Sequence, residues 1–333
     1  MTSEEIKARA RALGFDLCGV APAADHPELA FFREWLDRGY GGTMTYLHRS
    51  AKKRLDIRNA EPSARTVIVT GTLYNTDRPY STEIADRDRA RIARYAWGDD
   101  YHEVIGARME GLLAWMRERS PEPFEARAYV DTGPIQERVF AKHGGLGWIG
   151  KNSCVINPEI GSWIFLAAII CSLPLQVDAP SPDQCGSCTL CIEACPTQAI
   201  VAPGVLDATR CISYLTIESK AAIPGPLRGA VGSHVYGCDV CQEVCPWNAM
   251  APRSDDPAWQ PRPAWDRVDL LTLAQRSNEE LAVALRGSPM ARTTVQGLRR
   301  NVAVALKNAA LKGCATTESS AGLQPCDADL SSD

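Results

Sequence analysis

The order of hydrophobic and polar residues predicts a mixed α/β (α+β) chain in which helices and short strands alternate. Ser3 is expected to cap an amphipathic helix over residues 3–13, which Gly14 ends. Compact apolar runs predict buried strands at residues 15–20, 66–70, 125–130 and 163–170. The last of these runs is far shorter than the ~20 residues that a membrane-spanning helix needs, so we expect no membrane span.

Apolar positions at helical spacing predict further helices. We expect an arginine-rich helix over residues 87–119, interrupted near residues 97–102. Its apolar face would be formed by Ile105, Met109, Leu112 and Leu113. After a connector with several prolines and tryptophans, two more helices are predicted at residues 278–286 and 293–310. The last helix has one apolar face, which must pack on another part of the chain.

The opposite face of this last helix is basic. It carries Arg299, Arg300 and Lys307, without an acidic residue nearby. Such charges suit contacts with the phosphates of a nucleic acid, although a solvated helix face is the slightly simpler interpretation.

Two cysteine runs carry the clearest chemical signal. The first has the C-x2-C-x2-C-x3-C-P spacing of bacterial two-cluster ferredoxins, in which the fourth cysteine binds the other cluster. The second is a C-x2-C-x3-C-P run, and Cys211 lies between the two. The spacing predicts two crossed ligand sets for 4Fe-4S clusters: Cys185, Cys188, Cys191 and Cys245 for one, and Cys195, Cys211, Cys238 and Cys241 for the other.

Structural zinc and disulfide bonds are the alternative uses of these cysteines. Zinc sites normally combine two separated C-x2-C pairs, without a third cysteine three residues on. The N-terminal residues show neither the basic nor the apolar segment of an export signal, so we expect a cytoplasmic protein with reduced thiols. Thirteen cysteines in such a chain indicate metal binding.

The composition is that of a globular protein, and the chain is long enough for a further domain beside the one that binds the clusters. Of 333 residues, 45% are hydrophobic and 23% are charged, which allows two domains with cores of their own. A net charge of -4 does not by itself indicate a nucleic-acid-binding protein, but it is compatible with a local basic face. The residues before the cysteine runs must form a partner surface or the redox centre that the clusters supply with electrons.

Asp131 follows the predicted strand at residues 125–130. In open α/β sheets the carboxyl end of a strand is where ligands bind. Equally, Asp131 or Thr132 could cap a helix that begins at Pro134. The residues alone do not decide between these two interpretations.

The segment 142–153 is rich in glycine and in hydrogen-bond donors. Its backbone can approach a large planar or anionic ligand closely. Residues 145–150 match G-x-G-x-x-G, but no acidic residue follows at the distance that a dinucleotide site requires. We therefore expect a cofactor other than a nucleotide.

Five segments of the chain resemble epoxyqueuosine reductases, the cobalamin-dependent iron-sulfur enzymes of tRNA queuosine biosynthesis. They are KRLDIR (53–58), RYAWGDDYH (94–102), YVDTGPIQER (129–138), GLGWIGKNS (145–153) and GCDVCQEVCPWN (237–248). The resemblance implies a cobalamin-binding catalytic domain of a trimmed nitroreductase-like type at 1–175, a ferredoxin-like domain with two 4Fe-4S clusters at 176–252, and a HEAT-like helical segment at 253–312. Residues 313–333 are expected to be a disordered tail, whose Cys314 and Cys326 bind no metal.

The reaction that the resemblance implies is the reduction of epoxyqueuosine to queuosine at the wobble position of tRNA. The epoxide becomes an alkene and water, which consumes two electrons and two protons. The clusters would pass electrons singly to cobalamin from an external donor that the sequence does not identify. Asp131 matches the catalytic aspartate of the family and would protonate the leaving oxygen, for which we expect an apolar pocket to raise its pKa.

The resemblance also implies contacts for the cofactor and the substrate. Arg54, Arg58, Asp131, Asn152 and Ser153 are expected to contact cobalamin. The sequence has no D-x-H-x-x-G run, so we expect no protein histidine on cobalt. Candidate contacts with tRNA are Arg138, Arg299 and Arg300, and we expect a monomer.

Two residues depart from the family pattern. Ile57 occupies a position that is usually proline, which affects the rigidity of its loop. Cys154 occupies a position that more often holds a hydroxyl or apolar residue, and we interpret it as a buried side chain that binds no cluster.

Two other functions are compatible with the sequence. A corrinoid iron-sulfur reductase of a small molecule would share the cofactors but would need no basic helix. A ferredoxin-like electron carrier would need neither Asp131 nor the segment 145–153.

Overall fold

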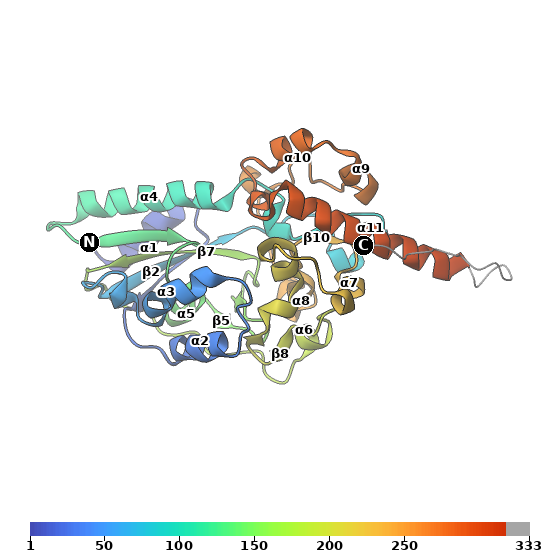
Figure 1. Cartoon of the computed structure of the whole chain (residues 1–333). Helices are drawn as coiled ribbons and strands as arrows, with labels where there is room; N and C mark the ends of the chain where they lie inside the picture. Colours follow the sequence, from blue (N-terminus) through green and yellow to red (C-terminus); the bar gives the residue numbers. More distant parts are fainter. Residues whose placement is uncertain (318–333) are drawn as a thin grey trace.

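The computed structural model of the protein describes residues 1–317. Its N-terminal part is built on a four-stranded sheet in the order β1-β2-β7-β4 (Figure 1). The strands are β1 (Leu17–Pro22), β2 (Thr66–Leu73), β7 (Ile164–Cys171) and β4 (Ala126–Val130). These confirm the four predicted strands, but every pair in this sheet is antiparallel. The strand-end rule for open α/β sheets therefore does not explain the position of Asp131.

Helices cover both faces of this sheet (Figure 1). One face is covered by α1 (Ser3–Ala12) and α4 (Tyr101–Arg119), and the other by α2 (Pro27–Asp37), α3 (Thr45–Leu55) and α5 (Glu137–His143). The side chains of β2 alternate between two hydrophobic cores: Ile68 packs in the core with α1 and α4, whereas Val67 and Val69 pack in the core with α2 and α5.

Two helix starts differ from their predictions. Thr2 caps α1, because its hydroxyl accepts the backbone N–H of Glu5 in a capping box, whereas Ser3 is already helical. Helix α5 begins at Glu137 and not at Pro134, so neither Asp131 nor Thr132 caps it. This leaves Asp131 free for another role.

The predicted arginine-rich helix is helical only from Tyr101 onward. Residues 91–92 form the short strand β3 and residues 94–96 a 3-10 turn. The cause is Arg94, whose buried guanidinium donates to the carbonyls of Thr76 (3.0 Å) and Arg78 (2.8 Å). A helix in this place would take Arg94 away from these distant acceptors. The predicted apolar face of α4 is confirmed as buried.

The cluster region contains two short helices, α6 (Leu190–Glu193) and α8 (Val240–Glu243), which contact each other. It also contains β8 (Ile200–Ala202), β9 (Val205–Leu206), α7 (Gly225–Val231) and β10 (His234–Tyr236). Strand β10 pairs in parallel with β3 (Arg91–Ile92). The cluster region is thereby joined to a segment of the N-terminal part.

The C-terminal part consists of α9 (Leu270–Gln275), α10 (Asn278–Leu285) and α11 (Thr294–Thr317). Leu298, Val302 and Ala305 of α11 share a core with Val235 and Tyr236 of β10. This confirms that the apolar face of the last helix packs on the rest of the chain. The helix runs past its predicted end at residue 310, and the remainder of the predicted tail, residues 318–333, lies outside the described residues.

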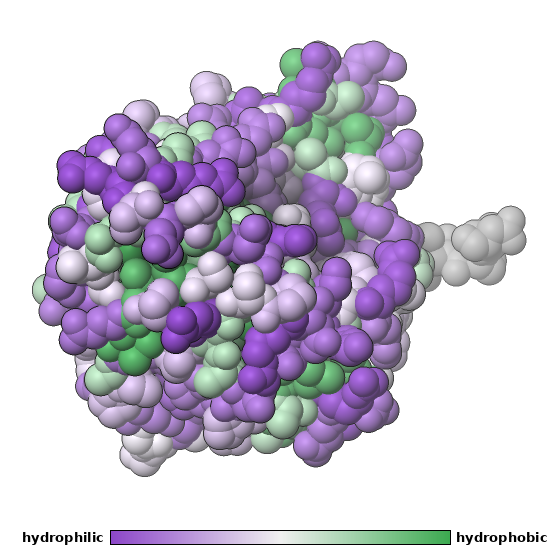
Figure 2. Space-filling view, turned by 90° about the vertical axis from the view of Figure 1, so that its left-hand side faces the viewer, coloured by the Kyte–Doolittle hydropathy of each residue, from purple (hydrophilic) through white to green (hydrophobic). Residues whose placement is uncertain are grey.

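The described surface is mainly hydrophilic on the side that Figure 2 shows, with smaller hydrophobic areas between the polar side chains. Among residues 1–317, no helix has the length and hydrophobicity required to cross a membrane.

Asn301 provides a test of how α11 is attached. Its buried side-chain amide donates to the carbonyls of Thr216 and Val235, both at 2.8 Å. Asn301→Ala removes the side-chain donor to the carbonyl of Val235, whereas the carbonyl of Thr216 keeps the hydroxyl of Thr293 as a donor (2.8 Å), so the free energy of unfolding should fall by about 2 kcal/mol. Chemical unfolding measures this, with Lys307→Ala on the exposed face of α11 as the control. Equal losses in the two variants would contradict the assignment.

Candidate active site

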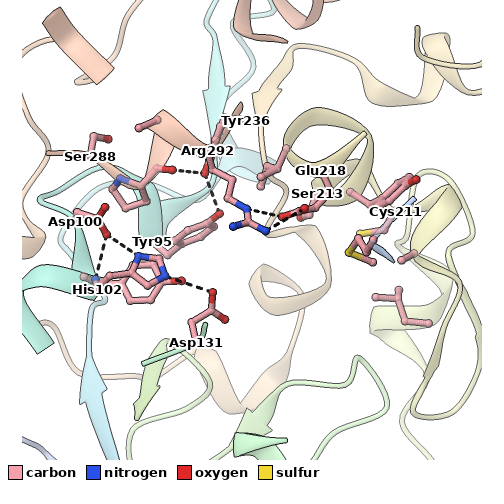
Figure 3. Close-up of a pocket in the computed structure, with 18 residues that line it drawn as sticks. Tyr95, Asp100, His102, Asp131, Cys211, Ser213, Glu218, Tyr236, Ser288 and Arg292 are labelled. Atoms are coloured by element: carbon pink, nitrogen blue, oxygen red, sulfur yellow. Dashed lines mark hydrogen bonds and ion pairs between the residues drawn. The ribbon is translucent and has the colours of Figure 1, made fainter. Parts of the chain in front are cut away.

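A cavity of about 440 Å³ lies where the three parts of the chain meet (Figure 3). The N-terminal part contributes Asp100, His102 and Asp131 to its lining, the cluster region contributes Cys211, Tyr214 and Glu218, and the C-terminal part contributes Ser288 and Arg292. A predicted cluster ligand, a carboxylate and an arginine thus line one space.

Asp131 directly follows β4 and has left-handed backbone geometry, with a φ of 56°. This conformation is rare for a residue with a side chain and is typical of functional sites. The carboxylate is 63% exposed within the cavity, and its Oδ2 lies 3.4 Å from Nε2 of His102.

His102 lies between two carboxylates at the start of α4. Asp100 caps this helix by accepting the backbone N–H of His102, and its Oδ1 also lies 2.7 Å from Nδ1 of the ring. Burial lowers the pKa of His102, but the hydrogen bonds to Asp100 and Asp131 outweigh burial and raise the pKa to about 9. The imidazole therefore carries its second proton at neutral pH.

The same contact decides the ionisation of Asp131. Partial desolvation in the cavity raises the pKa of Asp131, but the hydrogen bond and the positive charge of His102 hold it below its ordinary value. The raised pKa is expected for an apolar pocket that cobalamin covers, whereas in the open cavity the pKa of Asp131 is lowered. The physical reason for this lowering is an adjacent imidazolium that the sequence did not reveal.

The cysteines of the first predicted set lie near one another. Burial raises the pKa of the Cys191 thiol, and its neighbours Cys245, Cys185 and Cys188 raise it further. The indole N–H of Trp148 lies 3.4 Å from the sulfur of Cys185.

The cysteines of the second predicted set are also neighbours. Burial raises the pKa of Cys238, and the nearby Cys211 raises it further. Burial likewise raises the pKa of Cys211, and the nearby Cys195 adds to this rise. Cys154 lies beside this set, since it contributes to the raised pKa of Cys241. Burial raises the pKa of Cys154 itself to about 11.

Among the predicted cofactor residues, only Asp131 lines this cavity. Arg54 donates to the carbonyl of Ile135 (2.7 Å), and Arg58 forms ion pairs with Asp56 and Asp25. Asn152 and Ser153 instead attach the glycine-rich segment to the cluster region. The buried amide of Asn152 donates to the carbonyl of Cys241 (3.1 Å), and the hydroxyl of Ser153 donates to the carbonyl of Gly204 (3.1 Å).

The predicted tRNA contacts also have partners within the chain. Arg138 is exposed and donates to the carbonyl of Ser153 (3.0 Å). Arg299 donates to the carbonyl of Arg276 (2.6 Å), and Arg300 to those of Ser219 and Leu215. These bonds favour a structural role for Arg299 and Arg300.

Sequence reasoning missed two functional features of the lining. His102 stands in the RYAWGDDYH segment, whose spacing from Asp100 could have suggested a carboxylate-histidine pair. Arg292 forms a two-pronged ion pair with Glu218 (2.8 and 3.2 Å). It belongs to the C-terminal basic segment, but no local pattern indicates that it points into the cavity (Figure 3).

Two family models match the chain. Residues 184–248, which include all eight predicted cluster ligands, match the 4Fe-4S double cluster binding domain. Residues 54–132 match the family described as epoxyqueuosine reductase QueG, DUF1730.

Full-length relatives extend this match. An epoxyqueuosine reductase of Gloeobacter violaceus is 42% identical over 92% of this chain and 96% of its own length. One from Xanthomonas campestris is 41% identical over 91% of this chain and 86% of its own. The chain belongs to the epoxyqueuosine reductase family. The family consists of oxidoreductases, and this member carries its double cluster domain between the sheet and the C-terminal helices.

Solved structures of the family agree with this architecture. The chain superimposes on a crystal structure of epoxyqueuosine reductase with an epoxyqueuosine-modified tRNA-Tyr stem loop, with a TM-score of 0.83, 31% identity, and coverage of 92% of this chain and 80% of that one. A Bacillus subtilis structure, in which the catalytic aspartate loop is swung out of the active site, gives a TM-score of 0.82 at 30% identity and covers 97% of this chain and 86% of that one.

The pKa of His102 predicts how stability depends on pH. A raised folded-state pKa stabilises the fold fully below the ordinary value of 6.5, and this contribution is lost as the pH rises through about 9. The loss of unfolding free energy caused by His102→Gln should therefore be larger at about pH 6 than at about pH 9.5. Chemical unfolding at both pH values measures it, and the exposed His48→Gln is the control. A pH-independent loss would contradict the raised pKa.

Proposed function

We propose that this protein reduces epoxyqueuosine in tRNA to queuosine, with water as the second product. Membership of the family supports the activity, and the tRNA stem loop bound to a structurally similar relative supports the substrate. The single observation that carries the proposal is that Asp131 and the predicted cluster ligand Cys211 line the same cavity. An electron source and a proton-carrying carboxylate can therefore reach one substrate.

The finer division of the chain is part of this proposal. Residues 1–175 would form a cobalamin-binding domain related to nitroreductases, residues 176–252 the two-cluster domain, and residues 253–312 a HEAT-like segment. The C-terminal helices that pack on β10 and the lining residues that all three parts contribute support this division.

The two clusters have different environments. Cys188 of the first set is exposed, and Leu190 beside it is 47% exposed. Cys211 of the second set faces the cavity. We infer that electrons from an external donor enter at the surface cluster and leave from the cluster of Cys211 one at a time.

Cobalamin is compatible with this lining. The cavity has four tyrosines, whose flat faces and polar edges suit a large ring with amide side chains: Tyr95, Tyr101, Tyr214 and Tyr236. His102 is the only histidine among the described lining residues, and both its ring nitrogens face carboxylates. No free imidazole is therefore offered to cobalt. Cobalamin would supply a metal centre that accepts single electrons.

Ser213, Ser288 and Arg292 also line this space and offer hydrogen bonds to the edge of such a ring. The ion pair between Arg292 and Glu218 fixes the arginine, since both guanidinium nitrogens that it uses are directed at one carboxylate.

The side chains of Asp131 and His102 supply the proton that the leaving oxygen needs. His102 holds a proton at neutral pH and is hydrogen-bonded to Oδ2 of Asp131. Asp131 would first take this proton from His102 and then pass it, as a carboxylic acid, to the leaving oxygen. Asp100 holds the ring in place and stabilises its positive charge. Two electrons and two protons convert the epoxide into the alkene and water, and the second proton comes from solvent.

Two exposed basic residues are suited to contacts with the phosphates of tRNA. Arg138 is exposed seven positions after Asp131, in helix α5, and Lys307 is exposed on α11. We propose these side chains as phosphate contacts, because both are exposed, whereas Arg299 and Arg300 are half-buried and donate to carbonyls of the chain.

The role of Asp131 is tested by Asp131→Asn. The variant should keep both clusters and bound cobalamin but lose about a hundredfold or more of its single-turnover rate on epoxyqueuosine-containing tRNA, because it cannot donate a proton. Asp25→Asn, which removes a carboxylate paired with Arg58 outside the cavity, is the matched control. An undiminished rate in Asp131→Asn would rule out this role.

The ligand sets are tested by the iron content. Cys211→Ser should lose roughly half of the bound iron and sulfide, because only the second cluster uses this ligand. Cys154→Ser should keep the full content. Chemical analysis of anaerobically purified protein measures both. A full iron content in Cys211→Ser, or a loss in Cys154→Ser, would show that the ligand assignment is wrong.

A further inference from the structure

A second cavity, of about 250 Å³, shares no lining residue with the cavity around Asp131. Its lining comes from residues 78–97, from Glu243 of α8 and from residues 261–267. Tyr95 lines the first cavity and Trp97 the second. The 3-10 turn at residues 94–96 therefore separates the two spaces.

The lining of the second cavity is basic. The formal charge of its lining residues is +2, from four arginines and two carboxylates. These are Arg78, Arg89, Arg91 and Arg267, and Glu243 and Asp266. Both carboxylates already have partners. Asp266 accepts from Arg78 (2.9 Å), and Glu243 accepts from the backbone N–H and the hydroxyl of Ser81 (2.7 and 2.8 Å). Arg89 in turn pairs with Asp86 (3.4 Å) and Asp269 (3.8 Å), which lie outside the lining. Among the described residues, the positive charges of Arg91 and Arg267 therefore remain available to a ligand.

Two of these arginines come from the segment that the sequence predicted as helical. Arg91 lies in β3, and Arg89 forms an isolated bridge with Asp269. Residues two apart on an extended segment project to the same side. The extended backbone thus brings Arg89 and Arg91 into the wall of one cavity, where a helix would have placed them on different faces.

Several donors of this lining are unused. The Nε atoms of Arg78 and Arg91 and the indole Nε1 of Trp265 are buried without a hydrogen-bond partner among the described residues. Trp265 is only 3% exposed. Buried donors without acceptors are costly, so this wall favours a ligand that is rich in acceptor oxygens.

The backbone at the edge of the cavity is strained. Arg267 has a φ of 52°, which is unusual for a residue with a side chain. Its carbonyl accepts a hydrogen bond from the guanidinium of Arg89. Such strain persists where the surrounding contacts hold it, and it is typical of binding sites.

We propose that this cavity binds a phosphate group, carried by a ligand no larger than a mononucleotide or by an RNA backbone. Arginine forks match the oxygens of a phosphate in geometry and charge. The volume lies below the range of about 300–1,000 Å³ that larger cofactors occupy. The rings of Trp97 and Trp265 provide flat surfaces for the rest of a small ligand. The site is independent of the chemistry at Asp131.

The test is a titration of the intact protein, with both clusters, by calorimetry at fixed ionic strength. The probes are inorganic phosphate, guanosine monophosphate and an anticodon stem-loop RNA. Arg91→Gln removes a guanidinium of the wall and should weaken binding at least about tenfold. Arg87→Gln is the matched control, because Arg87 is an exposed arginine of the same segment that does not line the cavity.

The outcomes separate the two sources of phosphate. If Arg91→Gln weakens the binding of inorganic phosphate and of the mononucleotide, the ligand is a small free molecule. If it weakens the binding of the RNA alone, the ligand is a backbone phosphate. The proposal is overturned if Arg91→Gln binds all three probes like the wild type, or if Arg87→Gln weakens binding equally. Arg267→Gln, at an exposed position, repeats the test should Arg91→Gln unfold.

Discussion

The burial of one positive charge, on Arg94, determines how the N-terminal part meets the cluster region. The side chain is 2% exposed, and its guanidinium donates to the carbonyl and the hydroxyl of Thr76 and to the carbonyl of Arg78. Its backbone N–H donates to the carboxylate of Asp239 (2.5 Å). A buried cation is tolerated only with such a complete set of partners. The end of β2, the turn at residues 94–96 and the cluster region are consequently fixed to one another.

This arrangement creates both cavities. With Arg94 held, β3 lies along β10, and the backbone N–H of Ala93 donates to the carbonyl of Tyr236 (2.8 Å). Tyr95 and Tyr236 then line the cavity of Asp131, and Trp97 lines the other cavity. The catalytic cavity is therefore not a property of one domain. It exists only where the sheet, the cluster region and the C-terminal helices are packed together.

The features predicted from sequence are those that depend on local spacing. The buried strands, the apolar face of α4 and the cysteine runs follow from the character of residues two to four positions apart. Cys211 was proposed as a ligand beside Cys238 because it lies between the two runs, and the two residues are neighbours in the structure. Arginine is the residue whose contacts local spacing does not predict. Arg94, Arg299 and Arg300 use carbonyls far away in sequence, so their charges suggested a helix or an RNA contact.

The ionisation of Asp131 depends on whether water reaches the cavity. An apolar pocket would raise its pKa, but the open cavity leaves Asp131 in water beside the imidazolium of His102, and the charged pair is favoured. When water is excluded, the free energy of the ionised pair, carboxylate and imidazolium, rises more than that of the neutral pair, carboxylic acid and imidazole. A ligand that closes the cavity would therefore favour transfer of the proton from Nε2 of His102 to Oδ2 of Asp131. His102 would then remain hydrogen-bonded to Asp100 as a neutral ring. The acid form of Asp131 would thus arise when substrate is bound, which keeps the proton on His102 until the leaving oxygen is present.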